Sequence, residues 1–204
     1  MEAVANMGLG IRGPSVRIDW ITGLLIVTAT LIFLFGTVFI KTETSLLASG
    51  AITIMIAGLT LGVVFRTYSF DMNLSKKEFA QIMTWTIACM GVVLMMNYAT
   101  PRFSEIELAG FNPRFFGVLM GVSEETFFRG FLLPWLHRLT KSGILAVLLS
   151  ASAFAVFHLN VYSGQLSSLI IVLGGGLVLG YATLRTQRLT PATSGHCFIN
   201  FLAG

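Results

Sequence analysis

Residues 142–184, SGILAVLLSASAFAVFHLNVYSGQLSSLIIVLGGGLVLGYATL, contain no Asp, Glu, Lys or Arg. About 20 apolar residues of α-helix cross the roughly 30 Å hydrocarbon core of a bilayer, so this run is too long for one crossing. The polar, turn-forming residues 160–165 divide it into two parts. The sequence therefore predicts two consecutive membrane-spanning helices, the fifth and sixth of the chain.

Uncharged stretches elsewhere predict the remaining spans. Residues 21–40, 45–65 and 79–101 form the first three, residues 115–136 the fourth, and residues 189–204 begin a seventh. At 1.5 Å per residue the seventh reaches only about 24 Å, so we expect the chain to stop before that crossing is complete. The expected fold is all-α, a polytopic integral membrane bundle of about seven transmembrane helices. Residues 1–204 form one membrane domain, with N-terminal spans in 1–114 and the other spans in 115–204.

The composition supports this fold class and predicts an orientation. The chain is 55% hydrophobic and 11% charged, with a net charge of +4, and its mean hydropathy of +0.83 lies outside the soluble range. Basic residues accumulate in cytoplasmic loops, so we expect a cytoplasmic N-terminus, in a prokaryotic cell membrane. The positive charge then needs no nucleic-acid partner, and membrane lipid is the expected surrounding. The cytoplasmic basic residues are Arg12, Arg17, Arg66, Lys76, Lys77, Arg138, Lys141, Arg185 and Arg188, against Lys41, Arg102 and Arg114 outside.

Several polar side chains remain at membrane depth and call for a function or a partner, because a charge at a helix centre costs about 2.5 to 3.5 kcal/mol. On an α-helix, Arg129 shares a face with Glu125 and lies about 140° from Glu124. We therefore expect Arg129 to neutralise Glu125 and leave Glu124 free as a general base or acid. The full set is Glu124, Glu125, Arg129, His158, His196 and Asn200.

The expected depths of these residues do not coincide. Counted along straight helices from the outer surface, Glu124 lies at about 13 Å, His158 at about 6 Å and His196 at about 20 Å. Only tilted or bent spans would bring the three together.

Three short motifs carry a resemblance to a known family. Residues 123–130, SEETFFRG, resemble the EExxxR motif of the CPBP intramembrane peptidases, also called the Abi family, which include the type II CAAX prenyl endopeptidases. Phe154 and His158 match the family's FxxxH motif, and His196 and Asn200 match its HxxxN motif. The resemblance covers about residues 115–204, which would form the peptidase core.

The resemblance implies an endopeptidase that hydrolyses a peptide bond inside the membrane. Glu124 and His158 would activate water, and His196 and Asn200 would hold the oxyanion. The supporting residues would be Glu125, Arg129 and Phe154. It implies no cofactor and no metal. The implied partner is a hydrophobic or prenylated peptide or protein, either a CAAX-type C-terminus or a peptide leader.

A purely structural role and two other functions stay open as interpretations. Glu125 with Arg129 is also typical of a structural ion pair in a membrane helix. Glu124, His158 and His196 could be zinc ligands, although no HExxH motif is present. A non-catalytic membrane immunity or scaffold protein of the same family would tolerate decay of the motifs, which are complete here.

Overall fold

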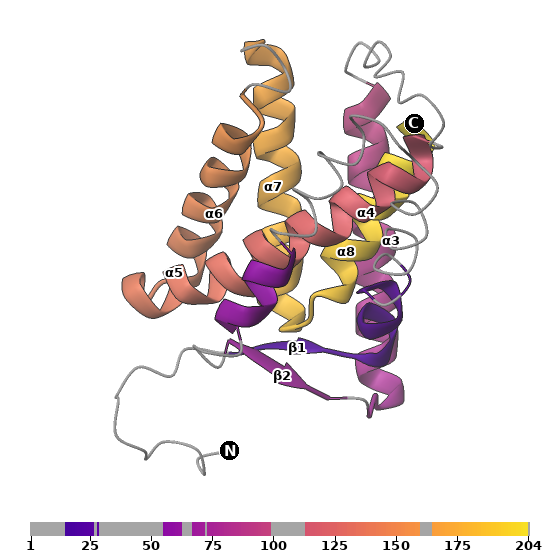
Figure 1. Ribbon diagram of the computed structural model, residues 1–204, viewed down its shortest axis with the longest axis vertical. Coiled ribbons are helices and arrows are strands. Elements are labelled where there is room, and N and C mark those ends of the chain that lie inside the picture. The colour runs from indigo at the N-terminus through magenta and orange to yellow at the C-terminus, as the bar shows by residue number, and fades with distance from the viewer. Residues whose placement is uncertain are drawn as a thin grey trace.

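The computed structural model describes residues 15–26, 28, 55–62, 67–71, 73–98, 113–159 and 165–203, and most of these are helical. The mainly helical fold class is therefore confirmed. Residues 20–26 and 55–62 are helical. The labelled helices are α3 Lys76–Tyr98, α4 Pro113–Glu125, α5 Leu133–Thr140, α6 Gly143–Phe157, α7 Leu166–Thr186 and α8 Thr190–Ala203, and a π-helix, η1 Thr126–Leu132, joins α4 to α5 (Figure 1).

The division of residues 142–184 into two helices is confirmed. Ser142 begins α6 as an N-cap, because its side chain accepts a hydrogen bond from the backbone N–H of Leu145 at 3.3 Å. The helix ends at Phe157, and α7 begins at Leu166. Among the described residues, α7 is the helix long and apolar enough to cross a membrane, judged by length and composition alone.

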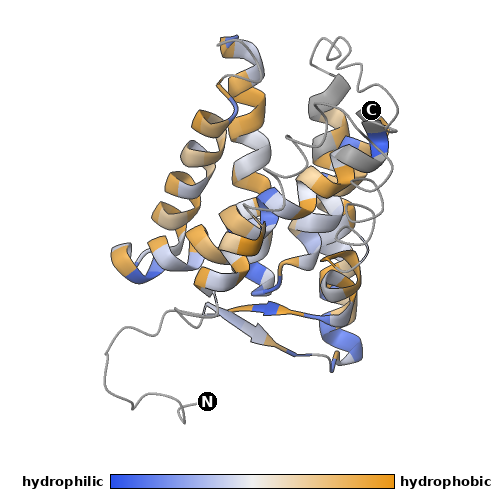
Figure 2. Ribbon diagram, in the orientation of Figure 1, coloured by the Kyte–Doolittle hydropathy of each residue, from blue (hydrophilic) through white to orange (hydrophobic). Residues whose placement is uncertain are grey.

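The other predicted spans are only partly represented. Residues 79–101 correspond to α3 and residues 189–204 to α8, whereas 21–40 and 45–65 fall largely outside the described residues. The number of spans therefore stays a prediction. Apolar side chains do cover outward faces of α6 and α7, as with Ile144 at 69% exposure and Leu166 at 72%, and Figure 2 shows hydrophobic residues along both helices.

The fourth predicted span is not a single straight α-helix. The helical run continues from α4 through the seven residues of η1 into α5. It ends at the C-cap Lys141, whose φ of 57° is left-handed. A π-helix closes i→i+5 hydrogen bonds, and such segments inside α-helices are frequent at functional sites. Figure 1 shows this run crossing the molecule obliquely, which changes where its side chains lie.

A small parallel sheet, which was not predicted, lies below the helices in Figure 1. Strand β1 Val16–Ile18 pairs with β2 Tyr68–Phe70, and Arg17 also forms a parallel bridge with Arg188, between α7 and α8. Val16 and Ile18 are both buried. β1 therefore joins the start of the described chain to the link between its last two helices.

Paired charges surround this sheet. The guanidinium of Arg188 lies 3.3 Å from Asp71 and 3.0 Å from Glu78, and that of Arg17 lies 3.2 and 3.1 Å from the same two carboxylates. Arg188 is almost fully buried, 3.8 Å from the buried Asp19. We call Arg17, Asp19, Asp71, Glu78 and Arg188 the base cluster.

Asp19 also ties two helices together. Its carboxylate accepts hydrogen bonds from the backbone N–H of Thr22 at 3.0 Å and from the hydroxyl of Thr190. The hydroxyls of Thr22 and Thr190 lie 2.6 Å apart. Because Thr190 is the first residue of α8, these contacts fix where that helix starts.

Candidate active site

Three elements bring one glutamate and two histidines together. Glu124 lies near the end of α4, His158 is the C-cap of α6, and His196 lies on α8. Glu124 Oε2 is 3.6 Å from His158 Nε2 and 3.7 Å from His196 Nε2. The expectation of different depths is therefore wrong, because α4 and η1 run obliquely and do not form a straight upright helix.

The ring of His158 is oriented by its own helix. Its Nδ1 lies 2.8 Å from the carbonyl oxygen of Phe154, four residues earlier. A carbonyl oxygen only accepts hydrogen bonds, so Nδ1 carries the proton. In the neutral imidazole, the Nε2 atom that faces Glu124 is then an acceptor.

The ring of His196 is oriented by Glu125, a role that was not predicted for that residue. His196 Nδ1 lies 2.8 Å from Glu125 Oε1. The same oxygen accepts a hydrogen bond of 2.8 Å from Arg129 Nη1, which confirms the expected ion pair. An ionised Glu125 therefore holds the Nδ1 proton of His196 and turns Nε2 toward Glu124.

Arg129 has two further contacts besides its ion pair with Glu125. It is fully buried, its Nη2 donates to the carbonyl of Gly176 at 3.3 Å, and its guanidinium lies 4.3 Å from the ring centroid of Phe154. Gly176 packs closely on α6, because a Cβ there would lie 3.1 Å from the Cβ of Ala151. The same glycine also leaves its carbonyl open to Arg129.

Phe154 separates and supports the two imidazoles. Its ring centroid lies 4.4 Å from that of His158 and 5.7 Å from that of His196. One aromatic side chain thus contacts both histidines and the arginine, which limits the rotation of each. The supporting role of Phe154 in the reaction stays a prediction.

Asn200 lies on the same face of α8 as His196 but has a different neighbour. Its Nδ2 donates to the carbonyl of Gly117 on α4 at 2.9 Å. A Cβ on Gly117 would lie 3.0 Å from the Cβ of Asn200, so the missing side chain permits this approach. Among the contacts of the described residues, none joins Asn200 directly to Glu124 or His196.

Several buried polar atoms of this site have no hydrogen-bond partner among the described residues: Glu124 Oε2, Glu125 Oε2 and Arg129 Nε. Leaving a buried acceptor unsatisfied is costly, and more so in a bilayer than in water. Glu124 Oε2 faces two imidazole nitrogens just beyond hydrogen-bond distance. Glu124 Oε2 is thus placed to accept a proton from a small molecule that is hydrogen-bonded between it and these nitrogens. We call Glu124, Glu125, Arg129, His158 and His196 the glutamate–histidine cluster.

Two other features bear on the chemistry. No group of three or more His, Cys, Asp or Glu side chains in the described part of the chain is arranged to hold a metal ion.

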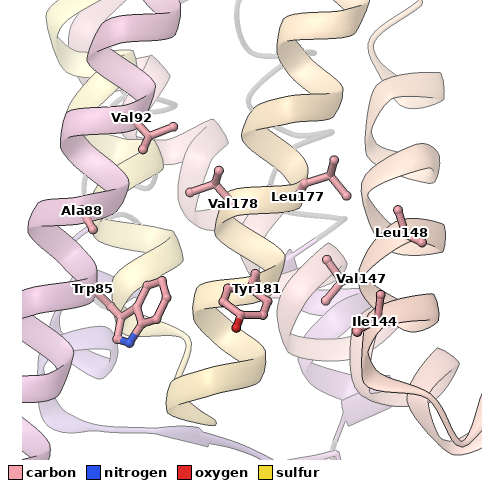
Figure 3. Close-up of a pocket in the computed structure, with 9 residues that line it drawn as sticks. All are labelled: Trp85, Ala88, Val92, Ile144, Val147, Leu148, Leu177, Val178 and Tyr181. Carbon is pink, nitrogen blue, oxygen red and sulfur yellow. The ribbon is translucent and has the colours of Figure 1, made fainter.

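A separate cavity of about 470 Å³ lies between α3, α6 and α7, and Figure 3 shows its apolar lining. The candidate site residues do not line it; its walls are Trp85, Ala88, Val92, Ile144, Val147, Leu148, Leu177, Val178 and Tyr181.

Comparison with protein families gives a match in the C-terminal half of the chain. Residues 111–202 match the family described as type II CAAX prenyl endopeptidase Rce1-like. The matched range runs from before Glu124 to beyond Asn200 and so includes all three motifs. Comparison with curated proteins and with solved structures gives no match. The family resemblance carried by the motifs is thereby confirmed.

Proposed function

We propose, on the premise that residues 111–202 belong to the Rce1-like family of type II CAAX prenyl endopeptidases, that the protein is an intramembrane endopeptidase. The family implies a membrane-associated protease. Beyond this, we propose that Glu124 and His158 activate the hydrolytic water. The substrate would be a membrane-delivered peptide, either a prenylated CAAX-type C-terminus or a hydrophobic peptide leader.

One observation carries this proposal. Glu124 Oε2 lies 3.6 and 3.7 Å from two Nε2 atoms, while the Nδ1 atom of each histidine is already engaged. With a neutral His158 ring, Glu124 Oε2 and His158 Nε2 are two acceptors that face each other. A water molecule between Glu124 and His158 can donate one proton to each and direct its lone pair at a carbonyl carbon.

The proposed reaction balances with these groups. The water oxygen forms a bond to the scissile carbonyl carbon, and its proton passes to Glu124 or His158. The carbonyl oxygen becomes an oxyanion. The C–N bond then breaks, and the leaving amine takes the proton back from the same base. No external oxidant, reductant or cofactor is required.

The oxyanion needs preorganised donors in a dry site. His196 can donate from Nε2 only as an imidazolium, because its Nδ1 proton is given to Glu125. Glu125 balances that charge, so Glu125 supports the oxyanion through His196. Asn200 has a second amide proton besides the one given to Gly117 and would be the other donor.

We also propose the membrane arrangement inferred from the loops: about seven spans with a cytoplasmic N-terminus. The exposed apolar faces of α6 and α7 support it. A cysteine introduced for Arg185 should be labelled by an impermeant reagent only after the membrane is opened. Labelling of this cysteine in intact cells would show that the orientation is opposite to the proposed one.

Product mapping tests the function. Membranes carrying the wild type, Glu124→Gln or the matched control Glu78→Gln are incubated with a prenylated CAAX peptide and, separately, a leader peptide. We expect cleavage by the wild type and the control and none above background by Glu124→Gln. Absence of cleavage of either peptide by a correctly folded wild type would favour the immunity or scaffold function.

Chelation separates the water mechanism from a zinc protease. Prolonged incubation with a strong chelator should leave turnover unchanged if Glu124 and His158 act on water directly. Loss of turnover that zinc alone restores would instead make the glutamate–histidine cluster a metal site.

A further inference from the structure

The ring of Tyr68 lies in a slot between two glycines. A Cβ on Gly62 would come within 1.6 Å of Tyr68 Cε2, and one on Gly130 would come within 2.4 Å of the phenol oxygen. Tyr68 belongs to β2, Gly62 lies in the helical residues 55–62, and Gly130 lies in η1. The slot therefore exists only because both residues lack a side chain.

The phenol at the end of this ring reaches the backbone of the π-helix. The Tyr68 hydroxyl donates to the carbonyl oxygen of Thr126, the first residue of η1, at 2.7 Å. The Ser150 hydroxyl, from α6, donates to the carbonyl of Phe128 at 3.0 Å. Side chains from two other elements thus hydrogen-bond to the carbonyls of η1.

A second contact holds η1 against residues 55–62. A Cβ on Gly58 would lie 3.3 Å from Cα of Phe127 and 3.4 Å from the carbonyl oxygen of Thr126. Gly58 and Gly62 are four residues apart and form a small-xxx-small face, which lets two backbones approach closely in a membrane. The carbonyl of Gly62 in turn accepts from the N–H and the hydroxyl of Thr67 at 2.7 and 2.9 Å. Two hydrogen bonds therefore link the slot to the residue that precedes Tyr68 in the chain.

The winding of η1 decides which side chains meet in the glutamate–histidine cluster. Glu124 and Glu125 end α4, and Arg129 lies within η1. A π-helix carries about one extra residue relative to an α-helix, so relaxing it to α would rotate its two flanks by about 100° and shift them by about 1.5 Å. Such a rotation would keep Glu125 and Arg129 on one face, as i and i+4, but it would turn this pair away from His196 on α8 and from the carbonyl of Gly176 on α7.

We propose that Tyr68 is a positioning residue, whose phenol, held between Gly62 and Gly130, keeps η1 wound as a π-helix and so sets the glutamate–histidine cluster in its working geometry. This rests on the proposed peptidase function for its effect on turnover. The effect on η1 does not depend on that function. Tyr68 itself touches neither substrate nor reacting atoms.

The test uses the full-length protein with spin labels at Arg114→Cys on α4 and Leu139→Cys on α5, two exposed positions that flank η1. The native cysteines Cys89 and Cys197 are buried. Tyr68→Phe removes only the hydroxyl, and Gly130→Ala fills the slot. Gly91→Ala is the matched control, because a Cβ there meets nothing within 4 Å.

We expect Tyr68→Phe and Gly130→Ala to shift the label distance and to lower kcat about tenfold or more with KM nearly unchanged, as for loss of one buried hydrogen bond that aligns catalytic groups. Gly91→Ala should change neither quantity. The proposal requires both effects; a shift without a fall in kcat, a fall without a shift, or neither, overturns it. If the wild type shows no turnover, the peptidase function fails, and the label distance alone still decides whether Tyr68 holds the π-helix.

Discussion

The glutamate–histidine cluster and the base cluster contain similar groups but use them differently. In the base cluster, the guanidinium of Arg188 contacts three carboxylates, and Asp71 and Glu78 remain about one-third exposed. In the glutamate–histidine cluster, the single guanidinium of Arg129 contacts Glu125, while Glu124 faces two imidazoles. The first arrangement neutralises charge and joins segments. The second leaves the carboxylate of Glu124 without a guanidinium partner, as the proposed proton transfer requires.

The largest expected effect is the loss of stability on removing Arg129. Arg129→Met leaves Glu125 fully buried with His196 as its remaining partner, and breaking a buried pair in this way costs about 3 to 5 kcal/mol. Glu125→Gln combined with Arg129→Met should recover much of that loss, while turnover stays low because His196 has lost its carboxylate. Melting temperature in detergent is the measurement. If Arg129→Met alone melts like the wild type, the ion pair of Glu125 with Arg129 is not needed for stability.

The next effect is on turnover rather than stability. Glu124→Gln should reduce turnover by roughly 10² or more, the usual scale for losing a general base, with a melting temperature near that of the wild type. Its carboxylate has no guanidinium partner to leave unpaired, which is the contrast with Glu125. The division between the two adjacent glutamates fails if Glu124→Gln is the strongly destabilised variant.

In the base cluster the expected result is reversed. Asp19→Asn keeps the size of the side chain but weakens its hydrogen bond from Thr190 and its attraction to Arg188, at a cost of about 1 to 3 kcal/mol. Turnover per folded molecule should stay close to wild type. If turnover falls while the melting temperature holds, the base cluster contributes to catalysis and the contrast between the two clusters is wrong.

The smallest effect is the acid dependence of Glu78. Hydrogen bonds from Ser75, then one from Arg188, lower the pKa of Glu78 from 4.5 to about 2. A carboxyl whose pKa is lowered by folding contributes stability above its unfolded pKa and loses it as pH falls toward the folded pKa. We therefore expect this contribution to vanish between pH 4.5 and about 2. Melting curves of wild type and Glu78→Gln should converge over that interval, and a constant gap between them would contradict the assignment.

Helical spacing was sufficient to predict local relationships in the site. The ion pair of Glu125 with Arg129 follows from a separation of four residues, which the winding of η1 did not disrupt. The break between α6 and α7 follows from polar residues in an apolar run. Neither prediction needs knowledge of tertiary packing.

Tertiary relationships could not be predicted in the same way. The depth count for Glu124, His158 and His196 assumed straight spans, and an oblique run through a π-helix invalidates that assumption. The hydrogen bond from His196 to Glu125 joins residues 71 positions apart, and no spacing rule covers it. Three-residue strands such as β1 and β2 are too short to show an alternating pattern.

One signal was present in the sequence and was not used. Gly58 and Gly62 have the spacing of a close-packing pair, as Gly176 and Gly180 do. The first pair lies against η1 and beside Tyr68, whereas the second pair lies against α6. A small-xxx-small pair marks a place where backbones meet, and only the fold shows which backbone.

The position of β1 constrains the order in which the molecule can assemble during synthesis. β1 bonds to residues 68–70 on one side and to the α7–α8 link on the other, and Arg17 meets Arg188 about 170 positions later in the chain. At roughly 5 to 20 residues per second, translation takes on the order of 10 to 30 s to supply that second partner. The early segment therefore has one strand edge and several charges unpaired until nearly the whole described chain has emerged. Newly made protein is most open to proteases and chaperones during that interval.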